Sequence, residues 1–180
     1  VDLGNGGVLK GRADDYGDAG VVTTNGYTEN SFRHPAFSSD IYKGGAVNLT
    51  MGEGARWNVT GQSWVTSINT EEAETIENVL TAEDPIKAMK DMATIDLVSA
   101  NTDQNQYAHA MTIYEMQGDA VFNMSLDGNR DVSDMLYMKN ANGDYIINVV
   151  DPVTLDDMYA RRDNGELFNG LRFATVGELS

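Results

Sequence analysis

Apolar residues at every second position, in short runs between glycines, are the feature that most limits what this chain can fold into. Residues 110–150 contain three such runs, whose apolar members are Ala120, Phe122, Met124 and Leu126, then Leu136 and Met138, then Tyr145, Ile147 and Val149. A period of two is typical of strands with one buried face. Asn142-Gly143 has the residue types of a type I′ turn, so we expect residues 135–140 and 144–150 to pair as an antiparallel hairpin. The predicted meander over 110–150 would form from near neighbours and fold early.

The same alternation occurs in residues 46–68. Its inward positions are Val47, Leu49 and Met51, then Ala55, Trp57 and Val59, then Val65 and Ile68, with turns at 52–54 and 61–62. Strand, turn, strand, turn and strand within about 23 residues is typical of one coil of a β-solenoid. Trp64 is out of phase with the inward positions, so we expect it at the surface. There it either contacts a partner or a sugar, or lies on neighbouring side chains.

We expect one continuous domain with three parts. Residues 1–69 form β-helix coils with a long polar loop at 20–43, residues 70–93 form an acidic, partly helical insertion, and residues 94–180 form the final coils and a cap. Within the insertion, Asp84 followed by Pro85 predicts a helix start, with Ile86, Met89 and Met92 on one face. Residues 94–98 and 167–176 return to strand character.

Composition excludes several classes of partner. With 28 acidic and 12 basic residues the formal net charge is -16, which repels nucleic acid and anionic lipid, so we expect neither as a partner. No apolar run reaches the ~20 residues of a membrane helix, so no membrane insertion is expected. There is no cysteine for a disulfide or a thiolate metal site. Because the chain starts at Val1 without an initiator Met, we expect it to be a piece of a longer protein.

No residue pattern in the chain predicts an enzyme, a cofactor or a metal site. The two histidines, His34 and His109, are far apart and have no metal-ligand spacing. Adjacent acids such as Asp156-Asp157 point to opposite faces of a strand, so they do not form a glycosidase pair. Residues 127–131 (DGNRD) have some character of a calcium loop but lack its ligand spacing.

Four segments, in order, resemble the C-terminal passenger region of type Va, pertactin-like bacterial autotransporters, including its autochaperone region. They are GARWNVTGQSWVTSI, MTIYEMQGDAVFNMSLDG, VSDMLYMKNANGDYIINVVD and FNGLRFATV. Matching positions in the first are Gly54, Ala55, Trp57 and Val59, and those in the later segments are Gly118, Phe122, Ser133, Asp134, Leu136, Gly143 and Tyr145. The insertion at 70–93 departs from the family's coil.

The resemblance implies an all-β fold: a right-handed parallel β-helix with a C-terminal antiparallel, β-sandwich-like cap. It also implies a place at the cell surface of a Gram-negative bacterium, or secretion from it, as part of an adhesin-like virulence protein exported across the outer membrane. The residues expected to form the folding nucleus and cap are Gly118, Phe122, Asp134, Leu136, Asn142, Gly143 and Tyr145. A host or cell-surface ligand is expected, without its identity.

Three functions compete, and the first is the one that we favour from the sequence. The first is a non-catalytic passenger segment that acts as folding nucleus and stalk for an adhesin-like β-helix. The second is a β-helix polysaccharide lyase or hydrolase, which needs acids and bases gathered on one outer face. The third is a structural surface protein that self-associates end to end into fibres, because bare solenoid ends are strand edges.

Overall fold

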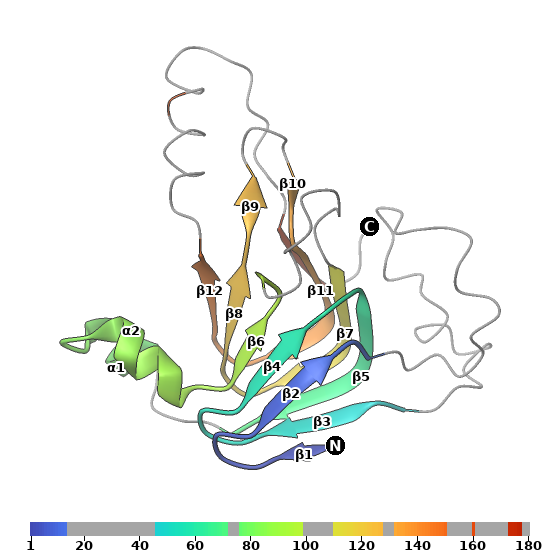
Figure 1. The fold of residues 1–180 in the computed structure, drawn as a ribbon, viewed down its shortest axis with the longest axis horizontal. Helices are drawn as coiled ribbons and strands as arrows, with labels where there is room; N and C mark the ends of the chain where they lie inside the picture. Colours follow the sequence, from blue (N-terminus) through green and yellow to red (C-terminus); the bar gives the residue numbers. More distant parts are fainter. Residues whose placement is uncertain are drawn as a thin grey trace.

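Parallel strands dominate the structure. The computed structural model describes residues 1–13, 46–71, 76–98, 110–127, 132–150, 160 and 173–177. Most of these residues lie in strands of parallel sheets, and helices are few, so the fold is all-β and parallel (Figure 1). The expected loop at 20–43, His34, His109 and residues 128–131 lie outside the described residues.

Two parallel sheets share one core. Sheet A has the order β1 (Asp2–Leu3), β3 (Asn48–Met51), β5 (Ser63–Thr70), β7 (Ala110–Gln117), β11 (Met135–Asn142) and β13 (Ala174–Val176). Sheet B has the order β12 (Tyr145–Val149), β8 (Ala120–Met124), β6 (Thr94–Asp96), β4 (Arg56–Val59) and β2 (Val8–Gly11). From β1 to β8 the chain alternates between the two sheets. Each new strand lies beside the previous strand of the same sheet.

Stacked apolar columns fill the space between the sheets. On sheet B, parallel register places Leu9, Trp57, Ile95, Phe122 and Ile147 in one column. Sheet A presents the column Leu49, Ile68, Met116 and Ala141. Trp57, Ile95 and Phe122 are at most 1% exposed. Because each fully buried large apolar side chain contributes about 1.5–3 kcal/mol, these columns are the main stabilising element.

The strands predicted in 46–68 and 94–98 are confirmed as β3, β4, β5 and β6. Val65 and Ile68 are both buried although they are three residues apart, a spacing that would place them on opposite faces of a regular strand. The backbone irregularity between them is visible in hydrogen bonding, since the N–H groups of Thr66 and Ser67 both donate to the Val47 carbonyl. Ile113 and Met116 in β7 repeat this spacing, so the irregularity itself is stacked from strand to strand.

The antiparallel hairpin predicted for residues 135–150 is wrong. β11 pairs in parallel with β7 and β13 in sheet A, whereas β12 pairs in parallel with β8 in sheet B. Asn142-Gly143 therefore turns the chain from one sheet to the other. The physical reason is that stacking on β7 and β8 supplies in-register ladder hydrogen bonds to both strands while burying Leu136 and Met138 in the shared core. A turn motif carries no information about such neighbours.

The expected antiparallel cap has little counterpart in the described part of 94–180. There the single antiparallel pair joins β9 (Leu126–Asp127) to β10 (Val132–Ser133), and β7, β8, β11 and β12 are all parallel. Most of residues 151–180 lies outside the description. The meander predicted for 110–150 is thus replaced by two parallel strand pairs.

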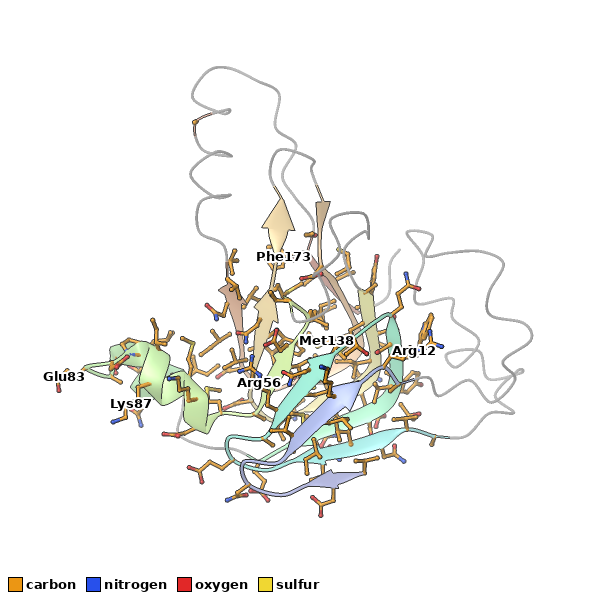
Figure 2. All side chains as sticks on the ribbon, viewed as in Figure 1. Arg12, Arg56, Glu83, Lys87, Met138 and Phe173 are labelled. Atoms are coloured by element: carbon orange, nitrogen blue, oxygen red, sulfur yellow. The ribbon has the colours of Figure 1, made fainter. Side chains whose placement is uncertain are left out.

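The partly helical character expected for 70–93 is observed. It contains α1 (Ile76–Thr81), α2 (Pro85–Ala88) and the 3-10 turn η3 (Met89–Asp91). The predicted start of α2 is confirmed, because Asp84 Oδ1 accepts a hydrogen bond from Lys87 N at 3.0 Å and Pro85 is the first helical residue. Glu83 and Lys87 project away from the sheets, whereas Met138 lies between them (Figure 2).

The shared apolar face predicted for the insertion is partly wrong. Met92 is 1% exposed and Met89 packs beside it, but Ile86 is 69% exposed. The α-helix ends at Ala88 and a 3-10 turn follows, so the spacing of an unbroken α-helix no longer applies. Two buried residues of the insertion, Val79 and Met92, form an apolar cluster with Val121 on the outer face of sheet B.

Candidate functional site

The residues predicted to form the folding nucleus lie mainly around one corner, where β7 turns into β8 and β11 turns into β12. Gly118 has φ +82° and Gly143 has φ +146°. A Cβ on Gly118 would overlap the Thr70 carbonyl oxygen, and a Cβ on Gly143 would overlap the Gly118 carbonyl oxygen. The chain segments at Thr70, Gly118 and Gly143 therefore approach one another so closely that no Cβ fits at the two glycines, and glycine is required there.

Hydrogen bonds connect these stacked corners. Gly118 N donates to the Asn142 carbonyl at 2.9 Å, and Asp144 N donates to Asp119 Oδ1 at 2.7 Å. Below them, Thr70 Oγ1 donates to the Gln117 carbonyl at 3.2 Å. Because side chains bond to the backbone of the neighbouring passage, the corner fixes the register of β11 on β7.

Sequence reasoning missed the acidic partners at this corner. Gly118-Asp119 and Gly143-Asp144 are the same dipeptide, and each follows an amide residue. In the structure those amides, Gln117 and Asn142, are register partners. The repeated amide-Gly-Asp pattern was the signal that the two segments stack in parallel.

Phe122 and Tyr145 lie just inside the corner. Their rings meet edge to face, with centroids 6.0 Å apart and an interplanar angle of 63°. Tyr145 OH donates to the Met116 carbonyl at 3.4 Å. Burial raises the pKa of the Tyr145 hydroxyl above 10.0, the Asp119 and Asp144 carboxylates add to this effect, and a backbone hydrogen bond at Asn142 opposes it. Tyr145 therefore stays protonated at neutral pH and serves packing.

Asp134 and Leu136 lie at the other end of the strands. Asp134 is fully buried, and its Oδ2 accepts hydrogen bonds from Ser125 N at 2.7 Å and Ser125 Oγ at 2.8 Å. Asp134 N in turn donates to the Ser125 carbonyl at 3.0 Å. These bonds tie the end of β8 to the start of β11, where Leu136 enters the core. The predicted set is thus split between two ends of the sheets.

Trp64 lies near the same end of sheet A as Leu136 but two strands away, since Thr112 is the register partner of both Trp64 and Tyr137. It points outward from β5 as predicted, in register with Thr112, but its side chain is half-buried. Its backbone N donates to the Ala13 carbonyl at 2.9 Å. The expected contact with a partner stays a prediction.

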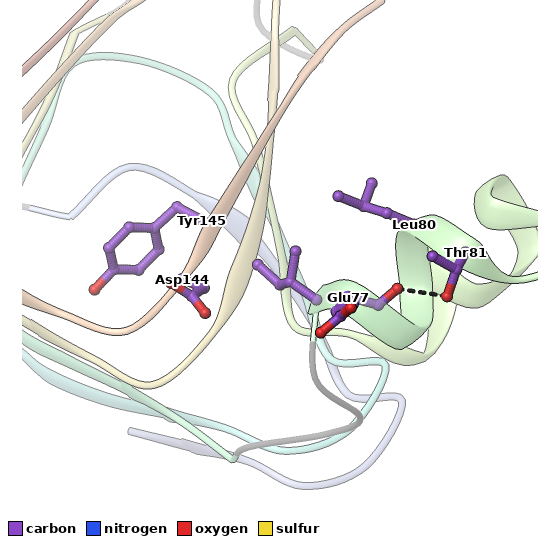
Figure 3. Close-up of a pocket in the computed structure, with 6 residues that line it drawn as sticks. Glu77, Leu80, Thr81, Asp144 and Tyr145 are labelled. Carbon is purple, nitrogen blue, oxygen red and sulfur yellow. Dashed lines mark hydrogen bonds between the residues drawn. The ribbon is translucent and has the colours of Figure 1, made fainter.

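A shallow, open pocket adjoins the corner (Figure 3). Its volume is about 520 Å³, and its lining comes from α1 and from the start of β12: Ile76, Glu77, Leu80, Thr81, Asp144 and Tyr145. Thr81 Oγ1 donates to the Glu77 carbonyl at 2.7 Å, which closes the last turn of α1. No local sequence pattern indicates this pocket, because it arises where α1 meets a strand far along the chain.

Two groups of hydrogen-bonded polar side chains lie on the outer face of sheet B. Arg56 forms an ion pair with the mostly buried Asp96, and Arg56 Nε donates to Asn58 Oδ1 at 2.9 Å. Asn148 Nδ2 donates to Asn123 Oδ1 at 2.8 Å. Within the described ranges no three His, Cys, Asp or Glu side chains come together as a metal site. The enzyme alternative is neither supported nor opposed by these observations.

None of the helices in the described part has the length and apolarity needed to cross a bilayer. Comparison of the chain with protein-family models, with curated proteins and with solved structures found no match.

Proposed function

We propose that the chain is a non-catalytic segment of an extracellular, autotransporter-type passenger. In this proposal it is a right-handed parallel β-helix whose C-terminal passages nucleate folding and serve as a stalk for an adhesin-like protein. Export across the outer membrane of a Gram-negative bacterium, and action at the cell surface, are parts of the same proposal. The resemblance of four ordered segments motivates it.

The observation that carries the proposal is the stacking of β7–β8 and β11–β12 on the preceding strands. In sheet A, β11 pairs with β7, and in sheet B, β12 pairs with β8, so each sheet has a strand edge on which a further strand can pair in register. Close contacts at Gly118 and Gly143 set that register. Adding a strand to an existing edge costs less than starting a new sheet, because the first passage must be ordered without a neighbour. A preformed C-terminal unit would therefore act as template for the N-terminal strands.

Limited proteolysis tests the template. Deleting residues 110–150 should make residues 46–71 protease-sensitive, because β5 and β6 lose the strands on one side. The matched control replaces residues 76–91 with a short Gly-Ser linker, which keeps every strand pair and should leave 46–71 resistant. Equal resistance of 46–71 in the deletion variant and the parent would contradict the folding role.

Export needs a separate experiment. The chain, fused ahead of an autotransporter β-barrel in a Gram-negative host, should reach the cell surface in a protease-resistant form. The Gly143→Val variant should reach it in a protease-sensitive form, since the corner cannot close. If parent and variant are displayed equally well and are equally resistant, stacking at this corner does not assist surface folding.

A second candidate, the fibre-forming surface protein, is favoured by one observation. Among the described strands β2 is an edge of sheet B, and Val8 in it is 64% exposed. An open parallel edge can pair with another copy. Concentration-dependent filaments in electron micrographs would support this candidate, whereas a monomer across the same concentrations would exclude it.

A further inference from the structure

The outer face of sheet A carries an ordered array of uncharged polar side chains. Parallel register forms two columns beyond the strand irregularity, one with Asn48, Ser67, Glu115 and Asn140, the other with Asp2, Thr50, Asn69, Gln117 and Asn142. All of them are exposed except the half-buried Ser67. We call these nine residues the amide face. Seven carry a neutral amide or hydroxyl, although the chain as a whole has a net charge of -16.

Apart from Asn48, the amides of this face are not used to hold the sheet together. On sheet B the stacked pair Asn123 and Asn148 bond to each other at 2.8 Å. On the amide face the one hydrogen bond between side chains joins Ser67 Oγ to Asn48 Oδ1 at 2.7 Å, among the residues that the structure describes. Within the described ranges, the side chains of Asn69, Gln117, Asn140 and Asn142 make no hydrogen bond. Their donors and acceptors therefore face solvent, available to a ligand.

We propose that the amide face binds a neutral polysaccharide. Adjacent strands are about 4.8 Å apart, which is close to the length of one sugar unit in an extended chain. A glycan lying along a column would thus offer hydroxyl groups to successive side chains. Amides and hydroxyls both donate and accept hydrogen bonds, as sugar hydroxyls do. Each sugar unit can therefore hydrogen-bond to the side chain beside it whether its hydroxyl acts as donor or as acceptor.

Charge and polarity argue against other occupants. A polyanion is repelled by the net charge and by Asp2 and Glu115 on the face itself. A polycation gains little from a face with seven neutral positions. An apolar surface, including that of a second copy, finds no exposed apolar side chain among the nine. The inference depends on sheet A and not on export, so it can fail or hold independently of the proposed function.

Affinity gel electrophoresis tests this inference on the full chain. The probes are hydroxyethylcellulose, xyloglucan and galactomannan as neutral polysaccharides and polygalacturonate as the polyanion. At least one neutral probe should retard the chain, and polygalacturonate should not. Retardation by none of the neutral probes, or by polygalacturonate as strongly as by them, would overturn the inference.

Two matched double variants locate the site. N69A/Q117A removes two amides of one column, and the retarding polysaccharide should bind about thirtyfold more weakly, since each of the two lost hydrogen bonds is worth about 1 kcal/mol. Q62A/N78A removes one Gln and one Asn that are exposed elsewhere, and its binding should equal that of the parent. Equal binding by both variants would place the ligand off this face.

A third variant and a second measurement separate loss of binding from misfolding or self-association. N69D/N142D keeps the side-chain shapes and adds negative charge, and it should also bind more weakly while keeping the parent's unfolding midpoint. Sedimentation velocity should show the parent and N69A/Q117A in the same oligomeric state. An oligomer that N69A/Q117A abolishes would identify the face as an interface between copies and overturn the proposal.

Discussion

The outer faces of the two sheets differ although their inner faces follow the same rule. On sheet A the outward positions after the irregularity are polar and, except for Ser67, exposed, whereas on sheet B the outward residue Val121 is 2% exposed beneath the helical insertion. Val121 and Ile146 pack there with Val79 and Met92. Apolar residues on the inner faces thus explain why both sheets form. The residues on each outer face determine whether that face is covered by other parts of the chain or exposed to solvent.

The insertion replaces a corner rather than lengthening a strand. It leaves sheet A after Thr70, beside Gly118, and rejoins the stack near Gly54, whose N–H donates to the Asp91 carbonyl at 2.9 Å. Other described passages turn at this edge within a few residues. A helical segment anchored at both ends of a corner lies naturally across the adjacent sheet, and here that sheet is B.

A charge placed on each outer face gives the sharpest contrast. Val121→Asp should lower the free energy of unfolding by about 4 kcal/mol, because an unpaired carboxylate would be buried under the insertion. Gln117→Asp, on the exposed amide face, should change it by less than about 0.5 kcal/mol. Denaturant titrations of both variants measure the difference. A similar loss in both would mean that the faces are covered alike.

A change at the corner should instead damage both sheets together. Gly143→Ala forces a side chain into a positive-φ position and against the Gly118 carbonyl, so we expect a loss of about 2–3 kcal/mol. Hydrogen exchange should accelerate in β11 and β12 equally. Faster exchange in only one of these strands would show that the corner does not couple the sheets. Gly6→Ala is the control, since a Cβ there meets no atom although its φ is also positive.

The sequence predicts the inner faces well and the neighbours poorly. Leu49, Met51, Trp57 and Val59 are buried as their alternation requires, because local periodicity depends only on which face is apolar. Asn142-Gly143 suits both a corner between two sheets and an antiparallel hairpin, because both use the same turn residues. What decides between them is that β11 pairs in parallel with β7 and β13, which the turn residues do not reveal. The uninterrupted apolar run Ala120, Val121 and Phe122 did carry a signal, since a strand covered on both faces loses its alternation.

The candidate site was predicted in composition but not in arrangement. Gly118, Asn142, Gly143, Phe122 and Tyr145 lie near one another, whereas Asp134 and Trp64 lie elsewhere. The pocket beside α1 and the amide face both depend on register between segments distant in the chain. Register requires knowledge of strand order, which single-strand patterns do not contain.

The amide pairs offer a smaller contrast between the faces. Asn148→Ala removes the bond to Asn123 on sheet B and should cost about 1 kcal/mol. Asn142→Ala removes an exposed amide that has no side-chain bond, and its effect should be close to zero. Thermal unfolding of the two variants checks this. Equal losses would mean that the amide face contributes to stability and is not reserved for a ligand.

The smallest expected effect is the pH dependence associated with Tyr145. Its pKa is raised in the folded state, so its contribution is complete below pH 10.0, the ordinary value, and is lost as pH rises through the folded pKa. Tyr145→Phe should remove this part of the alkaline decline in stability. Unfolding midpoints of both proteins between pH 8 and roughly pH 11 measure it. Parallel curves would show that the folded and unfolded pKa values are the same.

Disulfide trapping tests most directly the claim that the strands stack in parallel. The chain has no cysteine, so introduced pairs report without background. Gln117→Cys with Asn142→Cys joins register partners of β7 and β11, whose Cα separation of about 5 Å suits a disulfide. Lys139→Cys with Ile146→Cys joins residues that would face each other in the hairpin but belong to different sheets here. The account predicts rapid cross-linking of the first pair and none of the second, and the reverse result would contradict it.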